Sequence, residues 1–284
     1  MVAKSWRRIG AWTVALLGAG IAAGAAFIYS GVYDISATEQ HTVPVYWLIE
    51  ATMRRSVHVR ASRTTVPDLS SATMVRRGLS LYHVHCERCH GGPGAAPESF
   101  ALGLTPAPAN LTDTARRWSA ADIFWVVKYG IKMTGMPAWQ YRLQEQEIWD
   151  IVAFVHTELR QLSPVDYRMR VRETVQAVQA SPVSRQRSAV NAQEGKRAIQ
   201  QYACATCHYI PGITGATKPV GPTLRGMAAR SFIAGVLSNT SENMVAWLMS
   251  PQRIDPLSAM PDLGVTEQDA RNIAAYLETL INSD

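Results

Sequence analysis

The sequence predicts an all-α protein, in which one N-terminal membrane-spanning helix is followed by two small helical domains. The first observation is a long apolar run at residues 10–30 that contains no charged side chain. The second is a short cysteine motif that occurs twice, each time followed by apolar residues at helical spacing, whereas alternating strand patterns are scarce. We expect five segments: 1–31 (cytoplasmic tip and spanning helix), 32–70 (amphipathic membrane-proximal segment), 71–162 (first domain), 163–190 (linker) and 191–284 (second domain).

The run at residues 10–30 is long enough to cross a membrane, because a helix rises about 1.5 Å per residue and the hydrocarbon core is roughly 30 Å thick. Basic residues precede this run and acidic residues follow it. The positive-inside rule therefore leaves the N-terminus in the cytoplasm. We expect a single-pass protein of the inner (cytoplasmic) membrane, in contact with membrane lipid, with everything after residue 31 on the periplasmic side.

A cleaved signal peptide is the alternative, because Ala23-Gly24-Ala25 offers a small-residue cleavage pattern after the basic N-terminus. The apolar run is longer than the roughly 7–15 residues usual in a signal peptide, and Phe27-Ile28-Tyr29 extends it beyond that site. An uncleaved anchor is therefore favoured. Both interpretations export the rest of the chain.

The next segment predicts an amphipathic helix that starts near Pro44, a residue that suits a first helical turn. Val45, Leu48 and Ile49 recur at helical spacing, and the aromatic pair Tyr46-Trp47 lies near the start. Such a helix can lie among lipid headgroups or dock on a membrane partner. An ordinary helix packed on the first domain is the alternative, and the sequence leaves both open.

Composition and charge argue against a nucleic-acid partner. With 284 residues, 47% apolar and 18% charged, the chain is long and apolar enough for two packed domains. The net charge of +6 comes from residues 1–70, with 7 Lys/Arg against 4 Asp/Glu, and from 163–190, with 5 against 2. Because neither domain gathers positive charge, we expect no nucleic-acid groove.

The repeated motif has the pattern C-x-x-C-H, which is typical of covalent haem attachment. Its two copies are Cys86-Glu87-Arg88-Cys89-His90 and Cys204-Ala205-Thr206-Cys207-His208, and they use all four cysteines of the chain. Two thiols three positions apart on a helical turn reach the two vinyl groups of one haem, and the adjacent histidine then lies under the iron. The sequence therefore predicts two covalently bound haem c groups.

Other roles for the four cysteines fit the sequence less well. A zinc ribbon or a pair of disulfides would not require a histidine after each pair, and the pairs lie 118 positions apart. A thioredoxin-like redox site would need only one pair and a surrounding βαβ pattern, which the sequence lacks.

A methionine follows each motif at a similar distance and suits a second axial iron ligand. Met136 lies in Gly135-Met136-Pro137 after a predicted helix at roughly 119–131, and Met260 lies in Ala259-Met260-Pro261 after a predicted helix near 241–250. Proline disfavours helix at the residue before it, so each methionine is expected in an extended loop. Met133 is the nearby competitor in the first domain.

Each half is expected to close with a helix. The first has an apolar stripe at Ile148, Ile151, Val152, Val155 and Leu159, and the second has one at Ile273, Tyr276, Leu277 and Leu280. Thr266, with Asp269 three residues later, is a helix start signal. Gly78 and Gly195 lie in the helical patterns before the two motifs, where a missing side chain lets another helix approach.

Together these motifs resemble class I cytochrome c domains, over roughly 71–162 and 191–284. The resemblance implies a small all-α fold in which terminal helices cross around a haem ligated by His90 and Met136, or by His208 and Met260. In that family the histidine ligand donates its other ring nitrogen to a proline carbonyl. Pro222 is the matching residue in the second half. The first half departs from the pattern, and Pro108 is the favoured choice there.

A bis-ligated His/Met iron has no open position for a substrate, and the methionine raises its potential, which suits single-electron transfer. We therefore expect an electron carrier rather than an enzyme, with redox partner proteins such as a dehydrogenase, a quinol-oxidising complex or a terminal oxidase. An electron-transfer subunit of a larger dehydrogenase or oxidase complex is an alternative. A di-haem peroxidase is a further one, against which the two methionines argue.

Overall fold

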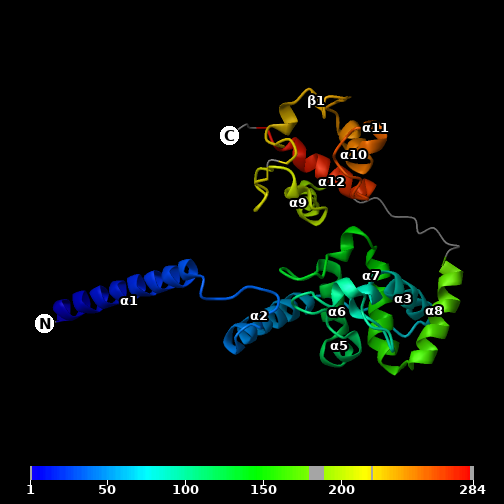
Figure 1. The fold of residues 1–284 in the computed structure, drawn as a ribbon, viewed down its shortest axis with the longest axis horizontal. Helices are drawn as coiled ribbons and strands as arrows, with labels where there is room; N and C mark the ends of the chain where they lie inside the picture. Colours follow the sequence, from blue (N-terminus) through cyan, green and yellow to red (C-terminus); the bar gives the residue numbers. More distant parts are fainter. Residues whose placement is uncertain (1, 179–188, 219, 282–284) are drawn as a thin grey trace. The chain divides into compact units, whose positions relative to one another are not determined.

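The computed structural model describes residues 2–178, 189–218 and 220–281, and helices dominate these residues (Figure 1). The described chain contains one small sheet, made of the antiparallel strands β1 (Phe232–Ile233) and β2 (Leu237–Ser238). The predicted all-α class is therefore confirmed. By its internal contacts the chain separates into residues 1–53 and residues 54–284.

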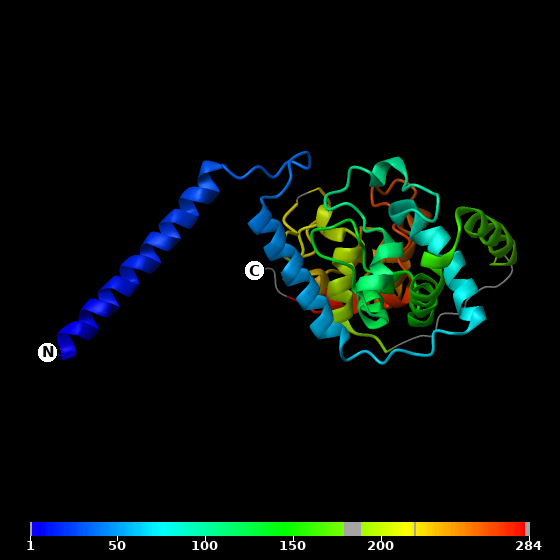
Figure 2. The same cartoon turned by 90° about the horizontal axis from the view of Figure 1, so that it is seen from below.

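The predicted N-terminal helix is present as α1 (Val2–Ser30), which Figures 1 and 2 show as one uninterrupted helix. Its stretch Ile9–Ser30 is long and apolar enough to cross a membrane, a property that a signal sequence can share. Large apolar side chains such as Trp12 and Ile21 are 70% and 74% exposed. The core of this chain does not cover these side chains. Only an apolar environment outside that core can therefore remove them from water.

The second helix, α2 (Val43–Ala61), begins next to Pro44 as expected. Its C-terminal end belongs to the first domain, because Val57 and Ala61 are buried and the Arg54 guanidinium lies 5.3 Å from the ring centre of Trp118. Its N-terminal end leaves large apolar side chains such as Trp47 exposed. The C-terminal end of α2 therefore packs on the first domain, whereas its N-terminal end exposes an apolar surface.

The first domain is a helical bundle around one buried apolar cluster. The predicted apolar stripe lies in this core, with Ile148, Val152 and Val155 fully buried. The predicted helix at 119–131 is α6. The helical elements are α3 (Ala72–His85), α4 (Glu87–His90), η1 (Ser99–Ala101), α5 (Leu111–Arg117), α6 (Ala120–Tyr129), η2 (Trp139–Tyr141), α7 (Glu145–Ala153), the π-turn η3 (Phe154–Glu158), η4 (Leu159–Gln161) and α8 (Pro164–Val178).

The second domain has its own buried apolar cluster. Thr266 caps its last helix as predicted, because the Asp269 backbone N–H donates to the Thr266 hydroxyl at 3.2 Å. The predicted helix near 241–250 is α10. The helical elements are α9 (Ala192–Gln201), η5 (Cys204–Thr206), η6 (Met227–Ala229), α10 (Ser241–Met249), α11 (Pro251–Ile254) and α12 (Glu267–Glu278).

In both domains the helix before the haem motif crosses the closing helix at a glycine. A Cβ atom on Gly78 of α3 would lie 1.9 Å from the carbonyl oxygen of Asp150 in α7. A Cβ on Gly195 of α9 would lie 1.9 Å from the carbonyl oxygen of Asn272 in α12. Only glycine allows backbones to come this close. The two crossings therefore correspond, and they give a common frame for comparing the domains.

The segment predicted as a linker, 163–190, begins with a helix that belongs to the first domain. Tyr167 of α8 is 2% exposed and lies in the first domain's core, and α8 packs along α3 (Figure 1). Residues 179–188 of the predicted linker lie outside the described part. The chain between the two helical bundles therefore runs from residue 179 to residue 191.

Within the compact unit 54–284, the two domains touch at the loop after Met136. Ala138 and Tyr141 are 3% and 6% exposed, and they pack with the second domain's core. The Tyr202 hydroxyl lies 3.1 Å from the Tyr141 carbonyl oxygen and 2.8 Å from Asp269 Oδ2. Burial, followed by the negative charge of Asp269, raises the pKa of Tyr202 to about 12, so this hydroxyl remains a hydrogen-bond donor at neutral pH.

Candidate haem-binding sites

Each C-x-x-C-H motif folds into one helical turn. In the first domain the His90 backbone N–H donates to the Cys86 carbonyl at 2.9 Å, and in the second the His208 N–H donates to the Cys204 carbonyl at 3.0 Å. This hydrogen bond joins the histidine to the first cysteine of its motif. A shared turn of this kind presents two thiols and an imidazole together, as attachment of one haem requires.

None of the four cysteines is paired in a disulfide. Burial, followed by the neighbouring Cys89, raises the pKa of Cys86 to about 12, and burial raises the pKa of Cys204 to about 11. Among the described residues no three or more His, Cys, Asp or Glu side chains gather as metal ligands. The zinc-ribbon alternative is thus not supported.

The two histidines are oriented by backbone carbonyls. His208 Nδ1 lies 2.7 Å from the carbonyl oxygen of Pro222, the contact that the resemblance implied. His90 Nδ1 lies 2.7 Å from the carbonyl oxygen of Ala109. The prediction of Pro108 as the acceptor is therefore wrong, and the acceptor is the next residue in the chain. A ring that donates from Nδ1 keeps Nε2 as the nitrogen for a metal. Both rings would therefore present Nε2 to iron.

Two further observations support a fit to haem. A Cβ atom on Gly221 would lie 2.6 Å from Cε1 of His208, so this glycine lets the ring pack flat against the backbone. Burial lowers the pKa of His90, although its hydrogen bond to Ala109 acts in the opposite direction. A neutral imidazole is the form that binds iron. When bound, haem supplies a one-electron Fe(III)/Fe(II) couple whose potential its axial ligands tune.

Met136 and Met260 occupy loops with the same local design. The Met136 backbone N–H donates to the Thr134 hydroxyl at 3.0 Å, and the Met260 N–H donates to the Ser258 hydroxyl at 3.2 Å. Both methionine side chains are partly buried against the core of their own domain. Such hydroxyl turns stabilise a loop locally. The sequence signal is a hydroxyl residue, a small residue, methionine and proline in succession, which the sequence analysis missed.

Met133, the competing ligand, lies on the surface. Its side chain is 97% exposed, and its backbone has a φ of 58°. A thioether that faces solvent has no contact with the core in which the haem would lie. The geometry therefore favours Met136 over Met133, and the ligand assignment itself stays a prediction.

The backbone after each histidine is held by a tyrosine hydroxyl, which the sequence analysis did not predict. Tyr82 of α3 donates to the Gly91 carbonyl at 2.6 Å, and Tyr276 of α12 donates to the Pro211 carbonyl at 2.7 Å. Counted from the two glycine crossings, Tyr276 corresponds to Phe154 in the first domain. The two domains thus support the same loop from different helices.

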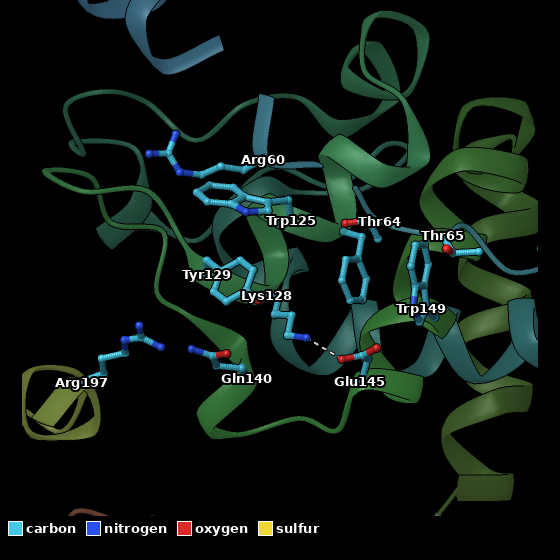
Figure 3. A pocket seen from close by; sticks show the side chains of 11 residues that line it. Arg60, Thr64, Thr65, Trp125, Lys128, Tyr129, Gln140, Glu145, Trp149 and Arg197 are labelled. Atoms are coloured by element: carbon cyan, nitrogen blue, oxygen red, sulfur yellow. Dashed lines mark hydrogen bonds and ion pairs between the residues drawn. The ribbon is translucent and has the colours of Figure 1, made fainter. Parts of the chain in front are cut away.

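The part of the molecule shown in Figure 3 is a cavity of about 630 Å³. Aromatic side chains from α6, among them Trp125 and Tyr129, line one part of it, and Gln140 and Arg197 extend into it from the two domains. Lys128 points toward Glu145 across it. None of the lining residues belongs to a C-x-x-C-H motif. This cavity is therefore separate from the candidate haem sites.

Comparison with known proteins gives the same two domains. Residues 73–155 match the family model described as cytochrome C oxidase, cbb3-type, subunit III, and residues 192–280 match the model of cytochrome c. The chain is 33% identical over 90 residues to cytochrome c oxidase subunit 2 of Alkalihalophilus pseudofirmus, which covers 31% of this chain and 25% of that protein. No solved structure matches.

Motifs, helical crossings and family matches all fall in the same two regions of the chain. The family models leave the N-terminal helix outside the regions they match. The chain thus contains two cytochrome c-type domains, preceded by an apolar N-terminal helix.

Proposed function

We propose that this protein is a membrane-anchored di-haem c-type cytochrome that faces the periplasm and transfers single electrons between respiratory-chain partners. The carrying observation is that each domain combines a C-x-x-C-H turn, a histidine oriented through Nδ1, and a methionine packed inward. Six-coordinate iron with these ligands exchanges electrons without binding substrate. In this proposal the protein is an electron carrier and not itself an enzyme.

The proposal predicts two covalent haems per chain, one on Cys86 and Cys89 and one on Cys204 and Cys207. Because thioether bonds survive denaturation, the haem is expected to remain with the polypeptide through acid-acetone extraction. A pyridine haemochrome assay against protein mass is expected to give a ratio near two. Replacing both cysteines of one motif by alanine is expected to reduce the ratio to near one, and a wild-type ratio near one contradicts the proposal.

The proposed localisation is the inner membrane, with α1 spanning it and both domains on the periplasmic side. N-terminal sequencing of the mature protein is expected to start at or close to Met1, because the apolar stretch extends to Ser30 and exceeds a signal peptide. Carbonate-washed membranes are expected to retain the protein. A mature N-terminus near Ala26, together with release into the soluble fraction, contradicts the anchor.

A second candidate is an electron-transfer subunit of a larger oxidase or dehydrogenase complex, which retains the same chemistry. The match of residues 73–155 to an oxidase-subunit model and the similarity to an oxidase subunit favour this assembly. Isolation from membranes in mild detergent separates the two forms. Co-migration with stoichiometric partner chains supports the complex, whereas migration at the size of this chain supports the free carrier.

A di-haem peroxidase is the weakest candidate, because one iron must then give up a ligand to admit peroxide. Both inward methionines argue against such an open position. The reduced wild-type protein is expected to show no peroxidase turnover above that of free haem.

A further inference from the structure

Helix α8 covers the backbone turn that follows His90. A Cβ atom on Gly92 would lie 2.8 Å from Cε1 of Tyr167, which shows how closely the ring packs on this turn. The Tyr167 side chain is 2% exposed, and a Cβ on Gly94 would lie 2.6 Å from Pro164 at the start of the same helix. Contacts this tight transmit displacement, since protein interiors are close-packed.

The turn is connected directly to His90. Gly91 donates its N–H to the Glu87 carbonyl at 2.8 Å, which joins the turn to the end of the haem-motif helix. Gly92 and Ala95 exchange two backbone hydrogen bonds, each 2.9 Å long. Tyr82 of α3 holds the Gly91 carbonyl from within the bundle. The turn is therefore held between Tyr82 on one helix and Tyr167 on another.

The second domain achieves the same support with its own closing helix, through Tyr276. At the corresponding place the first domain has Phe154, which carries no hydroxyl and packs 5.3 Å from the Tyr82 ring centre. In the first domain an additional helix, α8, packs on the turn after the histidine. This helix lies beyond the residues 73–155 that match the family model.

We propose that α8 belongs to the first haem-binding site. Its Tyr167 is a positioning residue, which holds the Gly91–Ala95 turn and, through that turn, His90. This inference rests on the proposed function, because it takes His90 as an iron ligand. Tyr167 holds the turn through the packing of its ring and not through its hydroxyl. The buried Tyr167 hydroxyl lies near the Glu87 carboxylate without a hydrogen bond of ordinary geometry, and Glu87 keeps His83 as its partner, so removal of the hydroxyl leaves no group unpaired.

The test uses the full-length, haem-loaded protein in detergent. Tyr167→Ala is expected to speed amide hydrogen exchange at Gly92 and Ala95 by about tenfold or more, because the turn loses its packing contact with the Tyr167 ring. The same variant is expected to shift the midpoint potential of one haem and to leave the other at its wild-type value. Tyr167→Phe is expected to keep wild-type exchange and potentials. Met169→Ala, at a position 51% exposed on the same helix, is the matched control.

A double-mutant cycle keeps the inference testable if Tyr167→Ala accumulates poorly. Gly92→Ala alone is expected to disturb exchange and potential, because the added methyl meets the Tyr167 ring, and to disturb them much less in a chain that also carries Tyr167→Ala. Wild-type exchange and potential in Tyr167→Ala, a Phe variant that behaves like the Ala variant, or additive effects in the cycle overturn the inference. A wild-type haem ratio below two overturns the proposed function instead.

Discussion

Replacing Gly78 by alanine is expected to destabilise the first cytochrome domain much more than the second. The added methyl would lie 1.9 Å from the Asp150 carbonyl oxygen, so α3 and α7 must separate. Forcing an extra methyl group into a close-packed core costs about 1–3 kcal/mol, and occasionally more, because side chains and backbones must move. Denaturant titration is expected to show one of two haem absorbance transitions at a much lower midpoint.

Gly195→Ala is the reciprocal variant, and it is expected to weaken the second domain through the Asn272 carbonyl in the same way. Gly103→Ala is the matched control, since nothing lies within 4 Å of a Cβ at that position. It is expected to stay within about 0.5 kcal/mol of the wild type. Wild-type midpoints in both crossing variants would show that the helices do not cross at these glycines.

Replacing Met136 or Met260 is expected to change one haem at a time. Methionine-ligated ferric haem has a weak absorption band near the red edge that disappears when the sulfur is lost. Met136→Ala is expected to remove half of this band and to open the first haem to cyanide. Met260→His is expected to keep six-coordinate iron but to lower the potential of one haem, because imidazole donates more strongly than a thioether to ferric iron.

Met133→Ala is the control for the first domain, because this side chain is 97% exposed and lies in the same loop as Met136. It is expected to keep the band at full strength. If Met133→Ala lost half of the band and Met136→Ala kept all of it, the ligand assignment in the first domain would be wrong, while the two-haem proposal would survive.

The sequence predicts the features of this molecule that depend on short spacings. Helical periodicity identified both closing helices, and Thr266 with Asp269 identified the start of α12. The glycines before each motif were identified as places of close approach, and the structure gives both crossings. These features follow from local steric and hydrogen-bonding rules, which act over a few residues.

The features that the sequence did not predict depend on contacts between distant residues. The carbonyl that orients His90 belongs to Ala109, because the loop path and not residue type decides which carbonyl reaches a ring. The roles of Tyr82 and Tyr276 were missed for a related reason, since a tyrosine at a core position also satisfies an apolar stripe. Helix α8 was taken as linker because its surface is polar and basic, and Tyr167 alone gave little apolar signal.

The assignment of α8 to the first domain shortens the tether between the two cytochrome domains. The chain that joins them runs from 179 to 191, less than half of the predicted 163–190. An extended chain spans at most about 3.6 Å per residue, so the maximum separation of the domains falls in proportion. A short tether raises the effective concentration of one domain around the other. The contact between the domains at Ala138 and Tyr141 is therefore intramolecular, and its formation is independent of how dilute the protein is.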